Sequence, residues 1–453
     1  MNGLAAELMA LQYQFERSEW WPQERLAAAQ FRQLGALVSH AAAQVPFYQD
    51  RLRQAGLVPD GPVTSEAWHR LPILTRRDLQ ANQTALTARA YPTDHGQLTS
   101  SASGGSTGVP VRVIKTALEA LFWNANLVRK ELWHRDKPEG HLVLIRSVAD
   151  AFSAEQRAAA RSPAGLRFPD WGPPCATLWQ TGPATLMDET LPVAEQAAGL
   201  ARLCPDYLLT KPASLRVLIA HCRRHGLRLP SLRQVWTLSE VVDDDLRTAC
   251  QQVLGAPIVH DYSANEVGYI AVQCPEAAHF HVMAESVLVE VLDDTGRQCA
   301  PGETGRVVLT PLQNFAMPLL RYEIGDEAVV GSPCACGRGL PVLQQIIGRT
   351  LDVLTLPDGS QRRAELRHYR LARLTAVTEY QVVQRALDRI EVLLVLNRPL
   401  TGDEEAEVRA LAVAAFGPEF TIDIRIVETI ARTPAGKLRP FLSMIDPPPE
   451  GGA

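Results

Sequence analysis

Four short segments of the chain combine residue types that can bind phosphate, a metal ion and a sugar. The first, TSSASGGSTGVPVRV at 99–113, places three glycines among hydroxyl side chains, ahead of Pro110 and a β-like VRV run. Glycines let backbone N–H groups approach phosphate oxygens, and hydroxyl groups donate further hydrogen bonds. A Walker A loop needs a lysine and a following helix, and this segment has neither. Its composition therefore predicts a phosphate-binding loop of another kind, with an ordinary flexible turn as the alternative.

Each of the other three segments carries one ionisable side chain of interest. Glu266, in HDYSANEVGYIA, follows a predicted strand, and open α/β sheets bind ligands at the carboxyl ends of their strands. Glu266 can hold a hard cation such as Mg²⁺, and Tyr262 offers an aromatic face to a base. Asp326 follows a glycine at a predicted strand end and can accept hydrogen bonds from sugar hydroxyls, while Lys437 follows a Pro–Ala–Gly turn. Taken singly, a surface carboxylate, a turn aspartate and a solvated lysine are the plainer interpretations, so the prediction depends on the order and spacing of the segments.

A separate set of cysteine and histidine side chains has the residue types of a metal site. Cys274 and His281 lie close in sequence, and Cys334 and Cys336 follow in a Pro–Cys–Ala–Cys–Gly loop. Soft thiolates with one imidazole are typical of a closed tetrahedral zinc site, and three reduced cysteines in loops are the alternative. His279 competes with His281, which we favour because it begins a strand. None of these residues lies in the other segments, so a zinc ion here is expected to be structural.

Hydrophobic periodicity predicts the elements that must position these residues. Residues 20–58 read as helical, Thr75 can cap a short helix, and strand–helix units alternate from 141 to about 260. This alternation indicates a largely parallel, helix-covered sheet. After Asp261, two alternating strands flank a DDTG turn, as in an antiparallel hairpin. We expect an α/β fold with a large domain over 1–348, a small α+β domain over 349–446 and a frayed tail over 447–453.

Composition excludes several classes of protein. The 453 residues carry 45 Lys and Arg against 50 Asp and Glu, a net charge of −5, which argues against a nucleic-acid coat or a polybasic membrane anchor. No apolar run reaches the length of a membrane-spanning helix, and the first residues lack a basic segment and a cleavage site. We therefore expect a cytoplasmic protein that binds neither nucleic acid nor membrane.

The motifs, in this order, resemble those of the AMP-forming (adenylate-forming) acyl-CoA synthetase superfamily, in the phenylacetate–CoA ligase and capsule-biosynthesis-type branch. The phosphate loop of that family is similar to 103–110, its Tyr-Gly-x-Thr-Glu segment to 262–266, its Tyr-Arg-x-Gly-Asp segment to 321–326, its hinge to 348–352 and its terminal Gly-Lys loop to 436–437. The chain departs from the pattern at Asn265, where many relatives have Thr or Ser, and at Leu351, which replaces the first acidic residue of the hinge. TLPDGSQRRAE replaces the usual glycine-rich stretch after the hinge, in a region where relatives receive a thiol acceptor.

The resemblance implies a two-step reaction and a role for each matching residue. A carboxylic acid, expected to be aryl or arylacetic, would be activated by ATP to an acyl-AMP and transferred to the thiol of coenzyme A. Glu266 would hold Mg²⁺, Lys437 would place a cation where negative charge builds, and a mobile small domain would swing about the hinge residues Leu351 and Asp352. The resemblance assigns the binding of ATP or AMP to Ser103, Gly104, Gly105, Ser106, Thr107, Gly108, Tyr262, Asn265, Asp326 and Arg349. Some members of the branch carry a similar Cys-His-Cys-Cys set.

Alternative functions remain open at this stage. The chain can be a stand-alone adenylating enzyme that passes the acyl group to a carrier-protein thiol or an amine, or one that adenylylates a cofactor. A nucleotide-binding protein without turnover is disfavoured by the presence of both Lys437 and Glu266. The acyl pocket is expected within 141–260, where an aromatic stripe is more often core than pocket. The oligomeric state is open, with a homodimer as one alternative.

Overall fold

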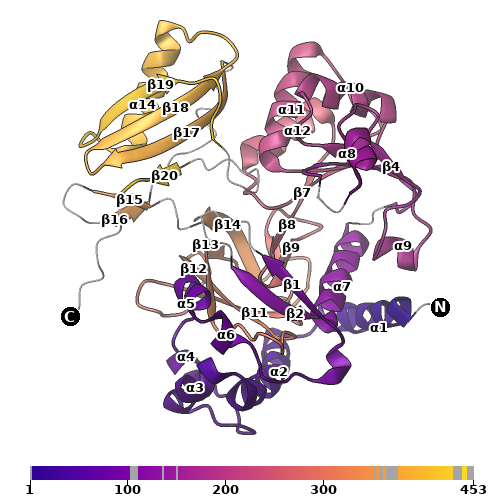
Figure 1. The fold of residues 1–453 in the computed structure, drawn as a ribbon, viewed down its shortest axis with the longest axis vertical. Helices are drawn as coiled ribbons and strands as arrows, with labels where there is room; N and C mark the ends of the chain where they lie inside the picture. Colours follow the sequence, from indigo (N-terminus) through magenta and orange to yellow (C-terminus); the bar gives the residue numbers. More distant parts are fainter. Residues whose placement is uncertain are drawn as a thin grey trace. The chain divides into compact units, whose positions relative to one another are not determined.

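The computed structural model describes residues 3–102, 111–134, 137–148, 152–349, 353–356, 361–363, 376–431 and 441–445. The described residues divide into two compact units, one ending at Gly348 and one beginning at Arg349 (Figure 1). The first unit combines helices with a large sheet, and the second combines a small sheet with a helix. This architecture confirms the predicted α/β class with an α+β C-terminal part.

A twelve-stranded sheet forms the frame of the first unit. Its order is β11-β12-β13-β14-β10-β9-β8-β7-β6-β3-β5-β4. The strands are β3 (Leu142–Arg146), β4 (Leu166–Phe168), β5 (Ala184–Asp188), β6 (Tyr207–Thr210), β7 (Gln234–Thr237), β8 (Ile258–Ala264), β9 (Gly268–Gln273), β10 (Phe280–Val282), β11 (Val287–Leu292), β12 (Thr304–Pro311), β13 (Tyr322–Val330) and β14 (Val342–Arg349).

Strand β8 joins a parallel half of this sheet to an antiparallel half. Strands β5, β3, β6, β7 and β8 pair in parallel, as predicted, and Thr237 of β7 lies opposite His260 of β8. From Asp261 onward β8 pairs antiparallel with β9, with a register shift between Tyr262 and Ser263. The predicted hairpin after Asp261 is present as the antiparallel pair β11–β12. The residues around Tyr262 therefore lie where the two halves of the sheet meet.

Alternate residues of the parallel strands face two different cores, as the two-residue period of a strand requires. Val143, Leu208 and Val235 belong to a core shared with helices α10 (Val193–Leu203), α11 (Pro212–His225) and α12 (Asp244–Leu254). Their neighbours Leu142, Tyr207 and Trp236 belong to the core on the opposite face. Figure 1 shows the three helices packed side by side on the parallel half of the sheet.

The N-terminal part of the first unit is helical. The predicted helix over 20–58 is wrong at its centre, because Pro46 has no N–H and restricts Val45 to an extended conformation (φ −112°, ψ 106°). Thr75 caps a short helix in a reciprocal capping box with Asp78, as predicted. No helix in the described part of the chain is both long and apolar enough to span a bilayer. The helices outside the parallel half are α1 (Gly3–Ser18), α2 (Gln23–Gln44), η1 (Pro46–Tyr48), α3 (Gln49–Ala55), α4 (Ser65–Arg70), α5 (Arg76–Ala81), α6 (Gln83–Leu86), η2 (Thr93–His95), α7 (Ala117–Trp133), α8 (Ala154–Ala160) and α9 (Cys175–Leu178).

A two-stranded antiparallel sheet flanks the segment predicted to bind phosphate. Strands β1 (Leu98–Ala102) and β2 (Arg112–Thr116) pair so that Ala102 lies opposite Arg112. The intervening segment 103–110 lies outside the described residues. Both ends of the predicted phosphate loop are therefore held by one hairpin.

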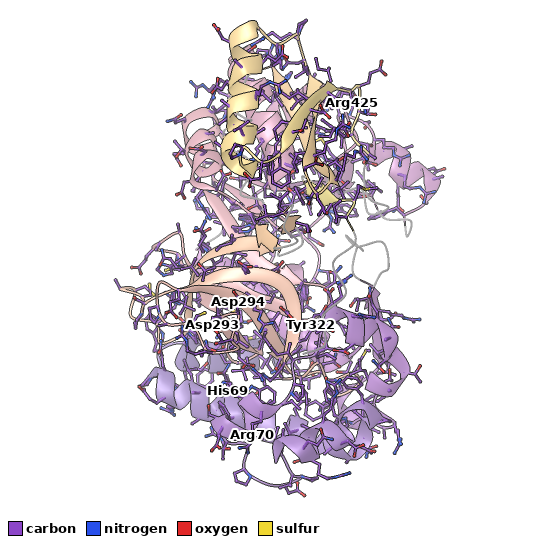
Figure 2. The ribbon with its side chains drawn as sticks, turned by 90° about the vertical axis from the view of Figure 1, so that its left-hand side faces the viewer. His69, Arg70, Asp293, Asp294, Tyr322 and Arg425 are labelled. Atoms are coloured by element: carbon purple, nitrogen blue, oxygen red, sulfur yellow. The ribbon has the colours of Figure 1, made fainter. Side chains whose placement is uncertain are left out.

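The second unit has a core of its own. Its strands β17 (Val377–Ala386), β18 (Arg389–Leu396), β19 (Thr421–Ile426) and β20 (Phe441–Ser443) form a sheet in the order β19-β18-β17-β20. Helix α14 (Gly402–Phe416) contributes Val408 and Phe416 to the core under this sheet. Arg425 of β19, labelled in Figure 2, donates to Glu391 of β18 at 2.9 Å. A separate pair, β15 (Val353–Thr355) and β16 (Gln361–Arg363), follows the first unit in sequence.

Candidate active site

Two residues predicted to bind the nucleotide contact each other. Tyr262 in β8 is 8% exposed and Asp326 in β13 is 9% exposed, and the Tyr262 hydroxyl donates a hydrogen bond to Asp326 Oδ2 at 2.7 Å. Strands β14, β10 and β9 lie between β8 and β13 in the sheet order, so the antiparallel half must curl for these side chains to meet. Asp326 lies inside β13 and not at a strand end, which corrects the sequence-based expectation. The side chains of β13 alternate in burial, and this places Asp326 on the buried face.

Glu266 lies in the turn between β8 and β9 and is only 4% exposed. Its Oε1 atom is 3.4 Å from Arg76 Nη1, at the start of α5. A buried carboxylate needs a compensating cation, and the guanidinium of Arg76 supplies one. Sequence reasoning missed Arg76, and the only local signal was its position directly after the capping residue Thr75.

A hydrogen bond connects the strand before the predicted phosphate loop to the turn that carries Glu266. Ser101 Oγ in β1 donates to the backbone carbonyl of Asn265 at 2.8 Å. Ser101 precedes the predicted loop by two residues, and Asn265 precedes Glu266 by one. Three of the four predicted segments thus meet through their described residues.

Strand β8 carries two titratable side chains with shifted pKa values directly before Tyr262. Burial raises the pKa of Asp261 to about 6, against the opposing effect of the Lys130 ammonium. Burial also lowers the pKa of His260 to about 4, and its Nδ1 lies 2.9 Å from Thr237 Oγ1. Lys130 is itself buried, paired with Glu131 Oε1 at 2.7 Å. Several ionisable groups of β8 and helix α7 therefore lie in a low-dielectric environment.

Arg321 anchors the segment that carries Asp326. It is buried with φ 52°, and its guanidinium binds Glu290 through Nη2 at 2.9 Å and Nε at 3.2 Å. Its Nη1 donates to the carbonyls of Leu71 and His69 at 2.7 and 2.9 Å. His69 and Tyr322, the residue after Arg321, are labelled in Figure 2. Arg321 therefore fixes the start of β13.

Several predicted site residues lie beyond what the structure describes. Arg349 is the last residue of β14, and its side chain is outside the described part of the chain. The other residues outside the described part are Ser103, Gly104, Gly105, Ser106, Thr107, Gly108, Leu351, Asp352 and Lys437.

The cysteine and histidine residues predicted to bind zinc lie at two adjacent hairpin tips. Cys274 and His279 bracket the β9–β10 turn, and Cys334 and Cys336 lie between β13 and β14. Strands β10 and β14 pair directly, with His281 opposite Val342, which brings the tips together. The predicted residues Cys274, His281 and Cys334 gather with His279, and their ligand atoms all lie within 4.8 Å of one another.

The sulfur–sulfur distance in this cluster matches tetrahedral zinc. Cys274 Sγ and Cys334 Sγ are 3.8 Å apart, and His279 Nε2 is 3.0 Å from Cys334 Sγ. Zn–S bonds of about 2.3 Å at tetrahedral angles place two sulfur atoms about 3.8 Å apart. Cys336 Sγ lies 3.4 Å from His281 Nε2 but is outside the four-membered set. Burial lowers the pKa of His281 to about 4, so its ring is neutral near pH 7, the form that binds metals.

Comparisons with known proteins agree with the resemblance found in the sequence motifs. The family model of the CapK C-terminal domain matches residues 365–443. A phenylacetate-coenzyme A ligase of Thermus thermophilus is 26% identical over 408 residues, covering 86% of both chains. A second, from Pseudomonas putida, is 22% identical over 431 residues, covering 92% of both chains.

Solved structures share the fold. A 2-hydroxyisobutyryl-CoA ligase in the postadenylation state with 2-HIB-AMP has a TM-score of 0.71 at 19% identity, covering 94% of this chain and 91% of that one. The anthranilate CoA ligase AuaEII with anthranoyl-AMP has a TM-score of 0.51 at 15% identity, covering 75% of this chain and 65% of that one. Motifs, fold and relatives agree: the chain has the fold of the adenylate-forming ligases and is similar in sequence to phenylacetate–coenzyme A ligases.

Proposed function

We propose that this protein activates a carboxylic acid with ATP and transfers the acyl group to coenzyme A. The observation that carries the proposal is the hydrogen bond between Tyr262 and Asp326, which joins two nucleotide motifs separated by 64 residues. Ser101 of β1 donates a hydrogen bond to the carbonyl of Asn265, the residue before Glu266, in the turn that follows β8. Full-length relatives named as coenzyme A ligases support the same reaction class.

The reaction proceeds in two displacements. A carboxylate oxygen attacks the α-phosphorus of ATP, and the bond to the β-phosphate oxygen breaks, which gives acyl-AMP and pyrophosphate. The thiol sulfur then attacks the acyl carbon, AMP leaves with its oxygen, and the thiol proton is released. Lys437 would place its ammonium where negative charge develops at the α-phosphate, Asp326 would accept hydrogen bonds from the ribose, and Arg349 would also bind the ribose.

Glu266 is the residue that would hold Mg²⁺. A carboxylate is the donor that Mg²⁺ prefers, and the metal commonly binds one or two carboxylates together with substrate phosphates. The guanidinium facing Glu266 shows that this buried carboxylate is accompanied by positive charge. The metal would supply charge neutralisation on the triphosphate.

The Cys/His cluster would hold a structural zinc ion. Cys274, His281 and Cys334 are the predicted ligands, and the mutual distances favour His279 over Cys336 as the fourth. This set contains no residue of the nucleotide motifs, so the ion would tie two hairpin tips together without taking part in the reaction.

The acid and the acceptor are open to experiment. Relatives named for phenylacetate support the aryl or arylacetic prediction. The alternatives are transfer to a carrier-protein thiol or an amine, or adenylylation of a cofactor, because TLPDGSQRRAE replaces the glycine-rich stretch usual after the hinge. A homodimer and a cytoplasmic location stay predictions.

Pyrophosphate release over a panel of aryl, fatty, dicarboxylic and amino acids, with and without coenzyme A, tests the proposal. We expect acid-dependent release of pyrophosphate and AMP, and a thioester when coenzyme A is present. Glu266→Gln should slow release by about 100-fold, while the exposed control Glu7→Gln on α1 should not. Release of ADP, or release that no acid stimulates, would contradict the proposed function.

A further inference from the structure

Arg76 is held on the strand that carries Asp326. The backbone of Leu74, two residues before Arg76, is hydrogen-bonded to β13. Its N–H donates to the carbonyl of Arg321, and its carbonyl accepts from the N–H of Glu323, both at 2.9 Å. The capping box at the start of α5 fixes the backbone turn that follows. The position of the Arg76 backbone is therefore set by one of the two strands that carry nucleotide motifs.

The side chain of Arg76 reaches the turn between β8 and β9. Its Nη1 atom lies 3.4 Å from Glu266 Oε1, and the two side chains are 19% and 5% exposed. The same turn accepts a hydrogen bond from Ser101 of β1, at the carbonyl of Asn265. Ser101 precedes the predicted phosphate loop by two residues, which span at most about 7 Å. Arg76 therefore contacts the predicted magnesium ligand in a turn that is also bound to the strand leading into the predicted phosphate loop.

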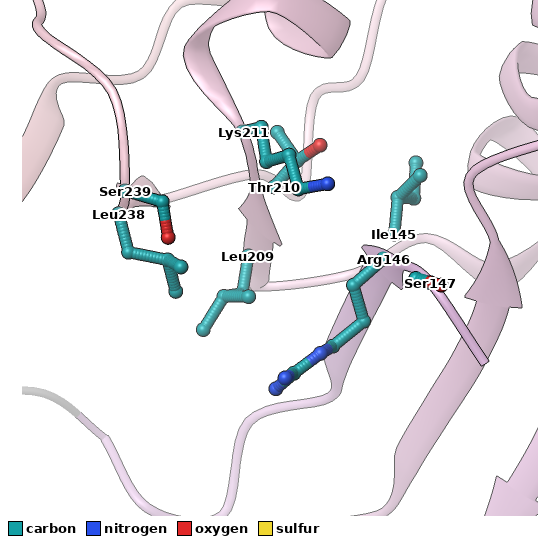
Figure 3. Close-up of a pocket in the computed structure, with 8 residues that line it drawn as sticks. All are labelled: Ile145, Arg146, Ser147, Leu209, Thr210, Lys211, Leu238 and Ser239. Carbon is teal, nitrogen blue, oxygen red and sulfur yellow. The ribbon is translucent and has the colours of Figure 1, made fainter. Parts of the chain in front are cut away.

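Two other cations of the first unit lie farther from Glu266. Arg146 and Lys211 line a cavity of about 160 Å³ at the carboxyl ends of β3 and β6 (Figure 3). Strands β6 and β3 are two and three strands from β8 in the sheet order, about 10 and 14 Å away, and Lys211 is paired with Glu189 Oε2 at 2.8 Å. Of these three cations, Arg76 is the one within ion-pair distance of Glu266.

The contact between Arg76 and Glu266 differs from a structural ion pair in the same unit. Arg321 binds Glu290 through two nitrogen atoms at 2.9 and 3.2 Å, and its side chain is 4% exposed. The 3.4 Å between Arg76 and Glu266 is longer than the roughly 2.7–2.9 Å usual for a charge-assisted hydrogen bond. A planar guanidinium suits bidentate contact with phosphate oxygens. The partly exposed guanidinium of Arg76 is therefore accessible to a ligand, unlike that of Arg321.

Charge balance links Arg76 to the nucleotide. A carboxylate as deeply buried as that of Glu266 is costly unless a positive charge accompanies it, and Arg76 provides that charge. Mg²⁺ held by Glu266 would supply a second positive charge at the same turn. A triphosphate carries more negative charge than one Mg²⁺ neutralises, so a guanidinium beside the metal ligand has a further anion to bind.

We propose that Arg76 is a further catalytic residue, which neutralises Glu266 while no nucleotide is bound and binds the β- or γ-phosphate when ATP is bound. The inference rests on the proposed function and adds to it a residue that touches the part of ATP that leaves as pyrophosphate. In the first displacement the bond between the α-phosphorus and the bridging oxygen breaks, and its electron pair stays on the pyrophosphate. A guanidinium at the β- or γ-phosphate stabilises this developing charge. The second displacement involves no pyrophosphate, so Arg76 acts on the first alone.

Calorimetry with ATP, AMP and inorganic pyrophosphate, each in the presence of Mg²⁺, tests the contact directly. Arg76→Gln should weaken the binding of ATP and of pyrophosphate by about 10- to 100-fold, as expected for a lost hydrogen bond to a charged group, and should change AMP binding by less than about threefold. Acid-dependent release of pyrophosphate should also fall, by at least about 10-fold. Arg77→Gln is the matched control, because Arg77 is the next residue of α5 and is exposed, and it should change none of these values.

Two further measurements separate phosphate binding from folding. Arg76→Gln removes the cation beside a buried carboxylate, so the melting temperature should fall. Combining it with Glu266→Gln removes both charges and should recover most of that loss. Thioester formation from chemically prepared acyl-AMP and coenzyme A, per folded molecule, should stay within about threefold of wild type in Arg76→Gln, because no pyrophosphate takes part.

The outcomes for the inference and for the proposed function are distinct. Unchanged affinity for ATP and pyrophosphate in folded Arg76→Gln, or an equal loss of AMP and ATP binding, would overturn the inference and leave Arg76 as a structural partner of Glu266. Acid-dependent pyrophosphate release by the wild-type chain would then leave the proposed function standing. A wild-type chain whose pyrophosphate release no acid stimulates would reject the proposed function and the inference together.

Discussion

The Tyr262 hydroxyl and the Asp326 carboxylate are 2.7 Å apart, and both side chains are more than nine-tenths buried. A phenol that donates to a carboxylate fixes the orientation of that carboxylate and reduces its mobility. An aspartate held in this way can bind two ribose hydroxyls without a further loss of side-chain entropy. If the proposed ribose role holds, the pair makes Asp326 a preorganised acceptor, and Tyr262 a residue that acts on the nucleotide partly through Asp326.

Asp326→Ala should weaken ATP binding, because hydrogen bonds to a charged acceptor contribute about 1.5–3 kcal/mol each. Tyr262→Phe should weaken it less, since the carboxylate remains. The dissociation constant for ATP, measured by calorimetry on both single variants and the double variant, gives the coupling between the two residues. An unchanged dissociation constant in Asp326→Ala would reject the ribose role.

Asp261 should make the stability of the protein depend on pH. Burial raises its pKa from the ordinary value of 3.8 to about 6, so the folded state binds more protons than the unfolded state between these values. The free energy of unfolding should therefore fall as pH rises from about 4 to above 6, by about 3 kcal/mol at 1.36 kcal/mol per unit.

Urea unfolding of wild type and Asp261→Asn across this range measures the difference. The two curves should diverge as pH rises, with wild type losing stability relative to the variant. Parallel curves would show that Asp261 titrates at its ordinary pKa in the folded protein.

Elements were predictable from sequence where the signal was local. The capping box at Thr75, the parallel strand–helix alternation and the hairpin β11–β12 all follow from residues close in the chain. The break at Pro46 could have been predicted, because proline lacks an N–H. It was missed because the apolar periodicity continues on both sides of it.

Contacts between elements that are far apart in the sequence were harder to predict. Arg76 and Glu266 are 190 residues apart, and their contact depends on where α5 packs against the curled sheet. The position of Asp326 inside β13 depends on how far that strand extends, and a glycine before it suggested an end. His279 could be named from sequence as a competitor, but the choice between it and Cys336 needs the distance between two hairpin tips.

The two hairpin tips should be held together by zinc. The purified protein should carry about one zinc per chain by elemental analysis, and its cluster thiols should resist a thiol reagent until a chelator is added. Cys334→Ser should lose the metal and lower the melting temperature, because the loops have few apolar contacts of their own. The adenylation rate per folded molecule should stay nearly unchanged.

His279→Ala and Cys336→Ser distinguish the two possible ligand sets. The mutual distances predict loss of zinc in His279→Ala and retention in Cys336→Ser. The reverse result would restore the set Cys274, His281, Cys334 and Cys336. Metal-free protein with all eight thiols reactive would reject the site.

At the scale of the whole molecule, the proposed catalytic residues are divided between two compact units. Tyr262, Glu266 and Asp326 belong to the first unit, and Lys437 lies in the sequence of the second. Each unit has its own hydrophobic core, so each can keep its internal structure if the other moves. Gly348, the last residue of the first unit, has φ 103°, a conformation that other residues rarely adopt. The junction therefore has a backbone geometry that is specific to glycine.

This division predicts that the two half-reactions can be separated by one substitution. Lys437→Ala should reduce adenylate formation by about 10²–10³-fold or more, because a fixed cation acts mainly on charge that develops in the transition state. ATP affinity should change little, since Tyr262, Glu266 and Asp326, which are proposed to bind the nucleotide and its metal, lie in the first unit. Thioester formation from chemically prepared acyl-AMP and coenzyme A should persist, because that step does not need a cation at the α-phosphate of ATP. Pyrophosphate exchange measures the first step and thioester release the second. Exchange within about threefold of wild type would show that Lys437 is not catalytic, and equal loss of both steps with a lowered melting temperature would assign it a role in the fold of the second unit.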